Sequence, residues 1–139
     1  MLVTLGSIAQ TIKVGAARTN AYLHILKDKK IAIVANQTSV IKNTHLIDSL
    51  LTLQINVLKV FSPEHGFRGI ADAGETVENK TDNQTGIPII SLYGSQKKPT
   101  QKQLEKIDIL LFDIQDVGAR FYTYISTLHY IMELSLIHI

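Results

Sequence analysis

The sequence of 139 residues contains no cysteine. It therefore has no disulfide bond, no thiolate nucleophile and no zinc site built on cysteine, although many periplasmic proteins lack cysteine too, so the compartment stays open. A Gly-x-Gly-x-x-Gly or Walker pattern is also missing after every predicted strand, which argues against a dinucleotide or nucleoside triphosphate ligand. The sequence predicts no cofactor.

Strong charge of one sign is lacking as well. Fourteen Lys and Arg residues against 12 Asp and Glu residues give a net charge of +2. No basic block is dense enough to follow a phosphate backbone, so nucleic acid is a weak hypothesis, and no membrane span is predicted. With 45% hydrophobic residues and a mean hydropathy of +0.13, the chain predicts one globular domain or part of one.

Both ends of the sequence look incomplete. Residues 1–9 are apolar and close in SIA, the small-x-small pattern that a signal peptidase cuts, but no charged region precedes them. We interpret them as the end of an export signal, which predicts a periplasmic or secreted protein; the alternative is a short N-terminal strand of a cytoplasmic protein. Residues 134–139 carry no stop signal and resemble a non-native tail, so the predicted domain is 10–133.

Helix and strand signals alternate along this domain, and the connections are long enough for parallel strands. Thr100 with Gln103 predicts a capping box, and Asn43 or Thr44 is the expected N-cap of an earlier helix. Residues 70–85 lack a sustained period, which predicts a long loop. The predicted strands are 31–35, 57–62, 87–92 and 107–113, and helical spacing occurs at 22–26, 46–51, 100–106 and 121–132.

The sequence is organised around residues 57–69, where a buried apolar strand stops at Pro63 and ionisable residues follow. Glu64, His65 and Arg68 therefore lie just past the carboxyl end of a strand. In open α/β sheets this is the edge at which ligands bind.

Polar residues follow two further strands: Asn36 with Thr38, and residues 113–120. Because the carboxyl ends of parallel strands share one edge, the three groups are expected to meet in one crevice. The structural alternatives remain open. Glu64 can cap a turn, His65 can be a surface histidine, and an Asp that closes a buried strand often only accepts backbone hydrogen bonds.

Alternatives also remain for the last segment. Arg120 can pair with Asp113 or Asp116, and of Tyr122 and Tyr124 one is expected in the core. His65, Glu64 and Asp116 together lack a recognised ligand spacing, so no metal is predicted.

Three blocks carry a resemblance to a known family. Residues 62–69 (SPEHGFRG), 92–94 (LYG) and 113–124 (DIQDVGARFYTY) resemble signature blocks of bacterial exo-β-N-acetylmuramidases, formerly a domain of unknown function. These glycoside hydrolases remove N-acetylmuramic acid from the non-reducing end of peptidoglycan fragments. Residues 36–38 also match, although Ser39 stands where a glycine is expected.

The resemblance implies a Rossmann-like, three-layer α/β domain with a mostly parallel sheet, truncated before a second domain that would complete the cleft. It implies muramyl saccharides from peptidoglycan as the substrate and cell-wall turnover as the role, and it leaves the oligomeric state open. A binding module for a cell-wall sugar or peptide is the competing class, and a sugar-phosphate enzyme is a weaker one.

Glycoside hydrolysis needs an acid for the leaving oxygen and a second group that supports the anomeric carbon. Glu64 is the candidate acid. We expect it to be desolvated beside Phe67, and desolvation favours the protonated form of a carboxyl group, which is the form that donates a proton. Asp116 is the candidate partner, with Tyr122 as its substitute and the acetamido group of the substrate as a third option.

The remaining candidates are assigned to substrate binding. His65 would orient Glu64 or bond the sugar, and Arg68 and Arg120 would receive the lactyl carboxylate of muramic acid, a planar anion suited to a guanidinium. Asn36 and Tyr93 complete the predicted substrate contacts.

Overall fold

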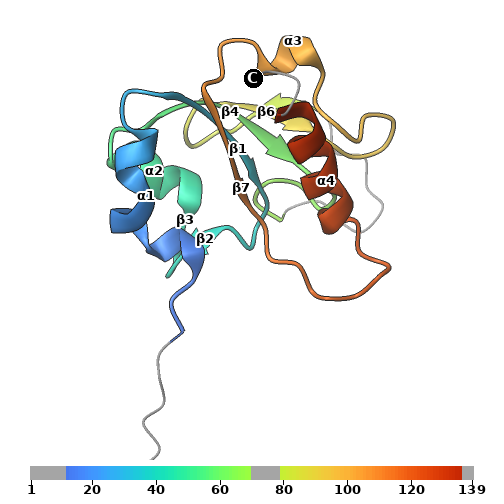
Figure 1. Cartoon of the computed structure of the whole chain (residues 1–139), viewed down its shortest axis with the longest axis horizontal. Coiled ribbons are helices and arrows are strands. Elements are labelled where there is room, and N and C mark those ends of the chain that lie inside the picture. The colour runs from blue at the N-terminus through green and yellow to red at the C-terminus, as the bar shows by residue number, and fades with distance from the viewer. Residues whose placement is uncertain (1–11, 70–78, 136–139) are drawn as a thin grey trace, which may run out of the picture.

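A computed structural model of the protein describes residues 12–69 and 79–135. Its main sheet has five strands in the order β5-β6-β4-β1-β7, and every pairing is parallel except that of β5 with β6 (Figure 1). The strands are β1 (Lys30–Ala35), β4 (Asn56–Ser62), β5 (Lys80–Thr81), β6 (Pro88–Ser91) and β7 (Ile109–Asp113); β2 (Val40–Ile41) and β3 (Thr44–His45) form a separate hairpin. The helices are η1 (Gly15–Ala17), α1 (Thr19–Leu26), α2 (Leu46–Thr52), α3 (Gln101–Leu104) and α4 (Tyr124–Ser135).

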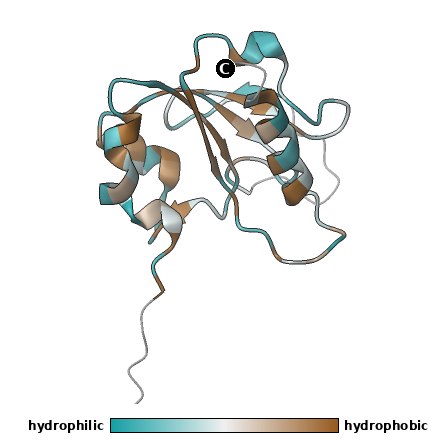
Figure 2. Ribbon diagram, in the orientation of Figure 1, coloured by the Kyte–Doolittle hydropathy of each residue, from teal (hydrophilic) through white to brown (hydrophobic). Residues whose placement is uncertain are grey.

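Helices cover both faces of the sheet, with α1 and α2 on one side and α4 on the other (Figure 1). Ile31 and Ile33 of β1 pack in the core that includes α1 and α2, whereas Ala32 and Val34 pack in the core that includes α3 and α4. Figure 2 shows the apolar strands between these two helical layers. The predicted Rossmann-like, three-layer α/β fold is confirmed.

The strand order creates a switch point between β1 and β7. The chain builds the sheet from β1 through β4 to β6 on one side and then returns to add β7 on the other side of β1. Connections from neighbouring strands diverge there, which opens a crevice at the carboxyl ends of the strands. The fold therefore provides a binding edge before any particular side chain is considered.

Local signals in the sequence identify most elements, with three corrections, the first of which is that β5 (Lys80–Thr81) lies within the loop predicted at 70–85. The capping box at Thr100 and Gln103 is present. The N-cap of α2 is His45, not Asn43 or Thr44, because residues 40–45 form the hairpin and the His45 ring accepts the Ile47 N–H. Helix α4 begins only at Tyr124, so Phe121 lies before it. Three residues of the predicted apolar side are exposed: Phe121, Ile125 and Met132.

Several predicted segments lie outside the described residues: the export signal at 1–9, most of the loop at 70–85, and residues 136–139. Export and the non-native tail therefore stay predictions. Helix α4 continues through Ser135, and Leu134 packs against the core on its side of the sheet. Within residues 12–69 and 79–135, no helix has the length and apolar character needed to cross a membrane.

Arg68 holds the loop after β4 to two other parts of the fold. Its Nη1 and Nη2 donate to the Asp48 carboxylate of α2 at 3.0 and 2.9 Å, and its Nε and Nη2 donate to Asp82 at 2.9 and 2.8 Å. The Asp82 carboxylate also accepts the N–H and hydroxyl of Thr85. These contacts, with the Arg68 hydrogen bond as the largest cause, lower the pKa of Asp82 to about 2.

Replacement of Arg68 by Ala should therefore destabilise the chain. Asp82 contributes stability above its ordinary pKa of 3.8, and that contribution is lost as the pH falls toward about 2. We expect Arg68→Ala to lower the free energy of unfolding by about 2 kcal/mol at pH 7, and by less at pH 2.5. Chemical unfolding followed by circular dichroism at both pH values measures this.

The ion pair between Lys98 and Glu133 provides the matched control. Its charged atoms are 3.7 Å apart and both side chains are about half exposed (53% and 50%). Lys98→Ala should change the stability by less than about 0.5 kcal/mol. If Arg68→Ala is as mild as Lys98→Ala at pH 7, the two carboxylate pairings do not brace the loop.

His45 is a second buried polar group beneath the site. Its Nε2–H donates to the Asn36 carbonyl at 3.0 Å, and its Nδ1 accepts the Ile47 N–H, so the hydrogen-bond network assigns a neutral ring with the proton on Nε2. The ring of Phe67 lies 4.4 Å away in edge contact. Burial is the main cause that lowers the pKa of His45.

This lowered pKa predicts a loss of stability in weak acid. Below the ordinary histidine pKa of 6.5, the unfolded chain gains a proton that the folded chain resists, so stability falls as the pH drops through that value. His45→Asn keeps an N-cap but cannot titrate. Between pH 7.5 and 5.5 the native chain should lose more unfolding free energy than the variant; equal losses would contradict a neutral His45.

Candidate active site

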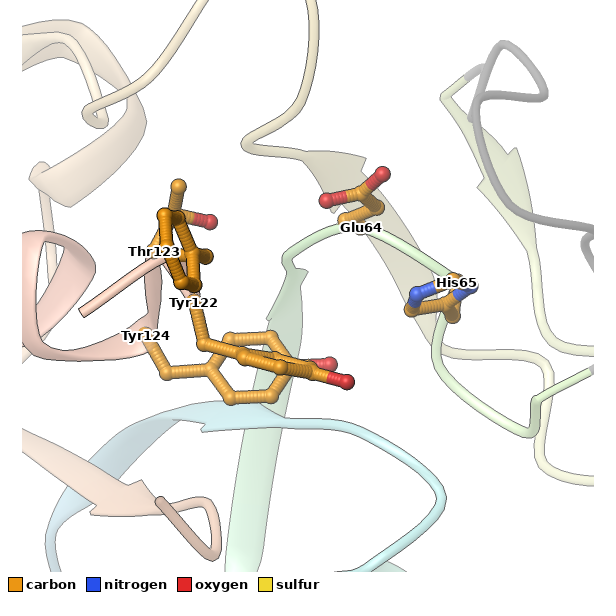
Figure 3. A pocket seen from close by; sticks show the side chains of 6 residues that line it. Glu64, His65, Tyr122, Thr123 and Tyr124 are labelled. Atoms are coloured by element: carbon orange, nitrogen blue, oxygen red, sulfur yellow. The ribbon is translucent and has the colours of Figure 1, made fainter. Parts of the chain in front are cut away.

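Two segments that follow neighbouring parts of the sheet face each other across a cavity of about 210 Å³ (Figure 3). Glu64 and His65 come from the loop after β4, and the opposite wall comes from the segment between β7 and α4. Its lining residues are Phe121, Tyr122, Thr123 and Tyr124. Since β1 lies between β4 and β7, the cavity is at the carboxyl edge of the sheet near the switch point.

The loop after β4 turns sharply to present its polar residues. Pro63 is buried and its carbonyl accepts the Gly66 N–H at 3.2 Å. His65 has φ = 70°, a left-handed conformation that costs a non-glycine residue about 1 kcal/mol. Phe67 is 1% exposed and packs on His45, so it anchors the loop in the core and does not line the cavity, contrary to the expected place beside Glu64.

The tyrosines of the opposite wall point toward Glu64 and His65. Figure 3 shows the hydroxyl groups of Tyr122 and Tyr124 directed to the Glu64 and His65 side of the cavity. The two rings are tilted by 54°, with centroids 6.5 Å apart. Tyr122 is half exposed, whereas Tyr124 is only 7% exposed.

Tyr93 reaches the same carboxylate from the loop after β6. A hydrogen bond to Glu64 is the main cause that raises the pKa of the Tyr93 hydroxyl, and the negative charge of Glu64 adds to it. The Tyr93 hydroxyl therefore lies close to the Glu64 carboxylate. The structure thus brings four of the predicted site residues together: Glu64, His65, Tyr93 and Tyr122.

Asn36 lies at the end of β1 and is fully buried. Its Oδ1 accepts the N–H and the hydroxyl of Thr38 at 2.9 and 2.7 Å, and the Thr38 oxygen accepts the Gln115 N–H at 3.0 Å. Ser39, where the family resemblance predicts glycine, is buried; its Oγ accepts the Asn36 N–H and donates to the Asp113 carbonyl. These bonds tie the end of β1 to the end of β7.

Asp113 itself faces away from the cavity. Ile109 and Leu111, at alternate positions of β7, pack in the core that includes α1 and α2, and the charge of Asp113 acts on Tyr22 of α1. Burial raises the pKa of the Asp113 carboxyl. Asp113 therefore does not line the cavity.

Arg68 is reassigned by its contacts. The guanidinium that was predicted to receive a lactyl carboxylate is bound by Asp48 and Asp82, and the side chain does not line the cavity. Its neighbours are two carboxylates, which repel an incoming anion. We therefore assign Arg68 to bracing the loop that carries Glu64 and His65.

Asp116 and Arg120 are both exposed on the segment between β7 and α4. The Asp116 carboxylate accepts the Gly118 N–H at 3.3 Å, which closes a local turn. It is not a lining residue of the cavity, so the structure brings Tyr122, and not Asp116, to Glu64. Arg120 lies directly before the lining residues.

Tyr124 and Thr123 are lining residues that the sequence patterns did not assign to the site. Helical spacing places residues two apart on different sides and so predicts one of Tyr122 and Tyr124 in the core; Tyr124, at 7% exposed, is buried as expected, yet it also lines the cavity. Residues 121–123 precede α4, and outside a helix residues i and i+2 can face the same way. The helix-start position was the missing signal.

The chemistry of the lining is that of hydroxyl, carboxyl and imidazole groups. Among the described residues, no lysine or arginine lines the cavity and no group of three potential ligands could hold a metal ion. The arrangement suits proton transfer at Glu64 and hydrogen bonding to uncharged oxygen atoms of a ligand. It offers no cationic pocket for a phosphate ester.

Comparison with known proteins identifies relatives of this chain. Residues 31–136 match the family described as "Exo-beta-N-acetylmuramidase NamZ, N-terminal". The chain is 49% identical over 116 residues to the "Peptidoglycan beta-N-acetylmuramidase NamZ" of Bacillus subtilis (strain 168), covering 81% of this chain and 28% of that protein.

Solved structures agree with this match. Two DUF1343 family proteins from Bacteroides fragilis NCTC 9343 superpose with TM-scores of 0.73, at 47% and 37% identity, covering 86% and 84% of this chain. The chain spans 30% and 29% of their lengths, less than a third in each case. Sequence and fold agree, and the chain belongs to the exo-β-N-acetylmuramidase NamZ family, whose N-terminal part it matches.

Proposed function

We propose that the native protein containing this chain is a glycoside hydrolase that releases N-acetylmuramic acid from the non-reducing end of peptidoglycan fragments. The observation that carries the proposal is the Glu64 carboxyl group in a hydroxyl-lined cavity, in a chain 49% identical to a peptidoglycan β-N-acetylmuramidase. The lack of lysine and arginine among the residues that line this cavity favours a sugar ring without phosphate over a sugar phosphate as the group bound beside Glu64.

Glu64 is the proposed general acid. Its proton passes to the glycosidic oxygen as the bond between that oxygen and the anomeric carbon breaks, so the leaving sugar departs as a neutral alcohol. Tyr93 lies close to the Glu64 carboxylate and His65 lies next to it in the cavity, so both groups orient the acid. Addition of water at the anomeric carbon and return of a proton to Glu64 complete the hydrolysis.

The positive charge that develops at the anomeric carbon requires support from an oxygen atom. Tyr122 is the proposed protein group, because its hydroxyl lies in the same cavity as Glu64, whereas Asp116 does not line it. The acetamido oxygen of the substrate is the alternative. A carboxylate pair, as in many glycosidases, is not required for either route.

Glu64→Gln tests the acid in the native protein that contains this chain. The variant keeps shape and hydrogen bonding but has no proton to transfer, and general acid catalysis supplies about 10² to 10⁴-fold. Turnover of the disaccharide in which N-acetylmuramic acid is β-linked to N-acetylglucosamine should fall by about that factor, with KM little changed. Release of N-acetylmuramic acid, followed by chromatography, measures it.

An activated substrate provides the control. A chromogenic phenolate leaves without help from an acid, so its glycoside should lose much less rate in Glu64→Gln than the disaccharide does. Equal losses on both substrates would assign Glu64 to a step other than leaving-group protonation. An unchanged rate on the disaccharide, with circular dichroism unaltered, would remove Glu64 from catalysis.

Arg120 is the proposed contact for the lactyl carboxylate, since Arg68 is bound by two aspartates. Arg120→Gln should raise KM for the N-acetylmuramic acid glycoside and leave KM for the N-acetylglucosamine glycoside unaffected. The preference of the enzyme for the first substrate over the second should therefore fall by about 10-fold. Arg18, on the first segment of the chain before α1, supplies a control variant, Arg18→Gln. Equal effects of Arg120→Gln on both glycosides would contradict the assignment.

A further inference from the structure

One buried donor beneath the cavity has no partner in the described part of the chain: the side-chain Nδ2 of Asn36. Asn36 is 0% exposed, so water does not replace the missing acceptor at its surface. The amide cannot simply be turned, because Oδ1 accepts two hydrogen bonds from Thr38 that an NH₂ group in its place would oppose. A buried, unsatisfied donor costs about 1 to 3 kcal/mol, so its retention calls for an explanation.

The neighbour of this donor is the hydroxyl of Tyr124. The Asn36 amide is close enough to the Tyr124 oxygen to favour the ionised phenol, but the two groups form no hydrogen bond in this structure. Burial outweighs that influence and, together with the charge of Glu64, raises the pKa of Tyr124. The hydroxyl therefore keeps its proton at neutral pH.

The direction of that proton follows from the two neighbours. If the Tyr124 oxygen accepts the Asn36 N–H, its own O–H must point elsewhere, and Figure 3 shows the hydroxyl directed into the cavity toward the Glu64 side. Glu64 influences Tyr124 by its charge, whereas it influences the Tyr93 hydroxyl as a hydrogen-bond acceptor. The Tyr124 O–H is thus available to a ligand.

We propose that Tyr124 is a ligand-binding residue of this site, whose O–H, oriented by the buried amide of Asn36, donates a hydrogen bond to an uncharged oxygen of the sugar held beside Glu64. The inference rests on the proposed function for the identity of the sugar. When the ligand binds, a hydrogen bond forms from the Asn36 amide to the Tyr124 oxygen and satisfies the buried donor. Ligand binding thereby stabilises the end of β1, where Asn36 lies.

Binding is measured in the Glu64→Gln background of the native protein, so that the disaccharide described above stays intact. Tyr124→Phe removes the hydroxyl and keeps the ring, and loss of one neutral hydrogen bond should weaken the affinity by about 3 to 10-fold in calorimetric titration. Tyr130→Phe, on the same helix but not a lining residue, should leave the affinity unchanged.

Asn36→Asp tests the orientation of the hydroxyl. The substituted side chain has the same shape but offers Tyr124 an acceptor, so the O–H turns away from the ligand and the affinity should fall as it does in Tyr124→Phe. The double variant should then be no weaker than Tyr124→Phe alone, because both changes remove the same bond. Additive losses would separate Asn36 from Tyr124.

The outcomes distinguish this inference from the proposed function. If the protein cleaves the disaccharide but Tyr124→Phe, folded by circular dichroism, binds it as tightly as the control, the role of Tyr124 is overturned and the proposed function stands. If the protein binds the disaccharide through Tyr124 and never cleaves it, the enzyme assignment fails and this inference stands. An absence of any binding by the unaltered protein overturns both.

Discussion

Parallel pairing of β1 with β4 and β7 is the constraint from which the site follows. Parallel strands end at the same edge, so the residues after β1, β4 and β7 meet although they are distant in sequence. Five consecutive residues of β1, Ile31–Ala35, are fully buried, and their apolar side chains hold the two helical layers on the sheet. The hydrophobic core thus fixes where Glu64 and the tyrosines lie.

Polar contacts then refine what the core has placed. On one side of the loop after β4, Arg68 is bound by Asp48 and Asp82; on its inner side, Phe67 packs against the neutral ring of His45. His45 in turn donates to the carbonyl of Asn36. A continuous set of contacts therefore runs from the ion pairs, through a buried histidine, to the residue that lies beneath Tyr124.

These connected contacts explain how residues outside the cavity act on it. A change at Arg68 removes a brace from the loop that presents Glu64, and a change at His45 affects both the start of α2 and the end of β1. Each group has a definite partner, so its effect on the site has a definite direction. Stability and function are linked here through shared residues.

The sequence predicts well what depends on local patterns. The apolar runs of β1 and β4, the capping box at Thr100 and the polar residues after the strands are all visible in the order of residues. The ion pairs of Arg68 are not visible, because Asp48 and Asp82 are 20 and 14 residues away. Nothing in the order of residues tells which of the carboxylates in the sequence pairs with this arginine. The hairpin at residues 40–45 is also missed, since strands of two residues have no period to detect.

Tyr122 and Tyr124 illustrate the remaining gap, and also why the site has its character. Their shared direction depends on the helix beginning at Tyr124 and not before it, a difference of three residues that propensities do not resolve. Once placed there, the two hydroxyls add neutral oxygen groups to the cavity that Glu64 lines, while Arg68 lies in the brace and Arg120 on the exposed segment before the lining residues. A site of this kind has little fixed positive charge where a glycosidic bond would break. In the proposed reaction, positive charge that develops on the sugar ring would then not be repelled, and Glu64 supplies the carboxyl group among the lining residues that stabilises it.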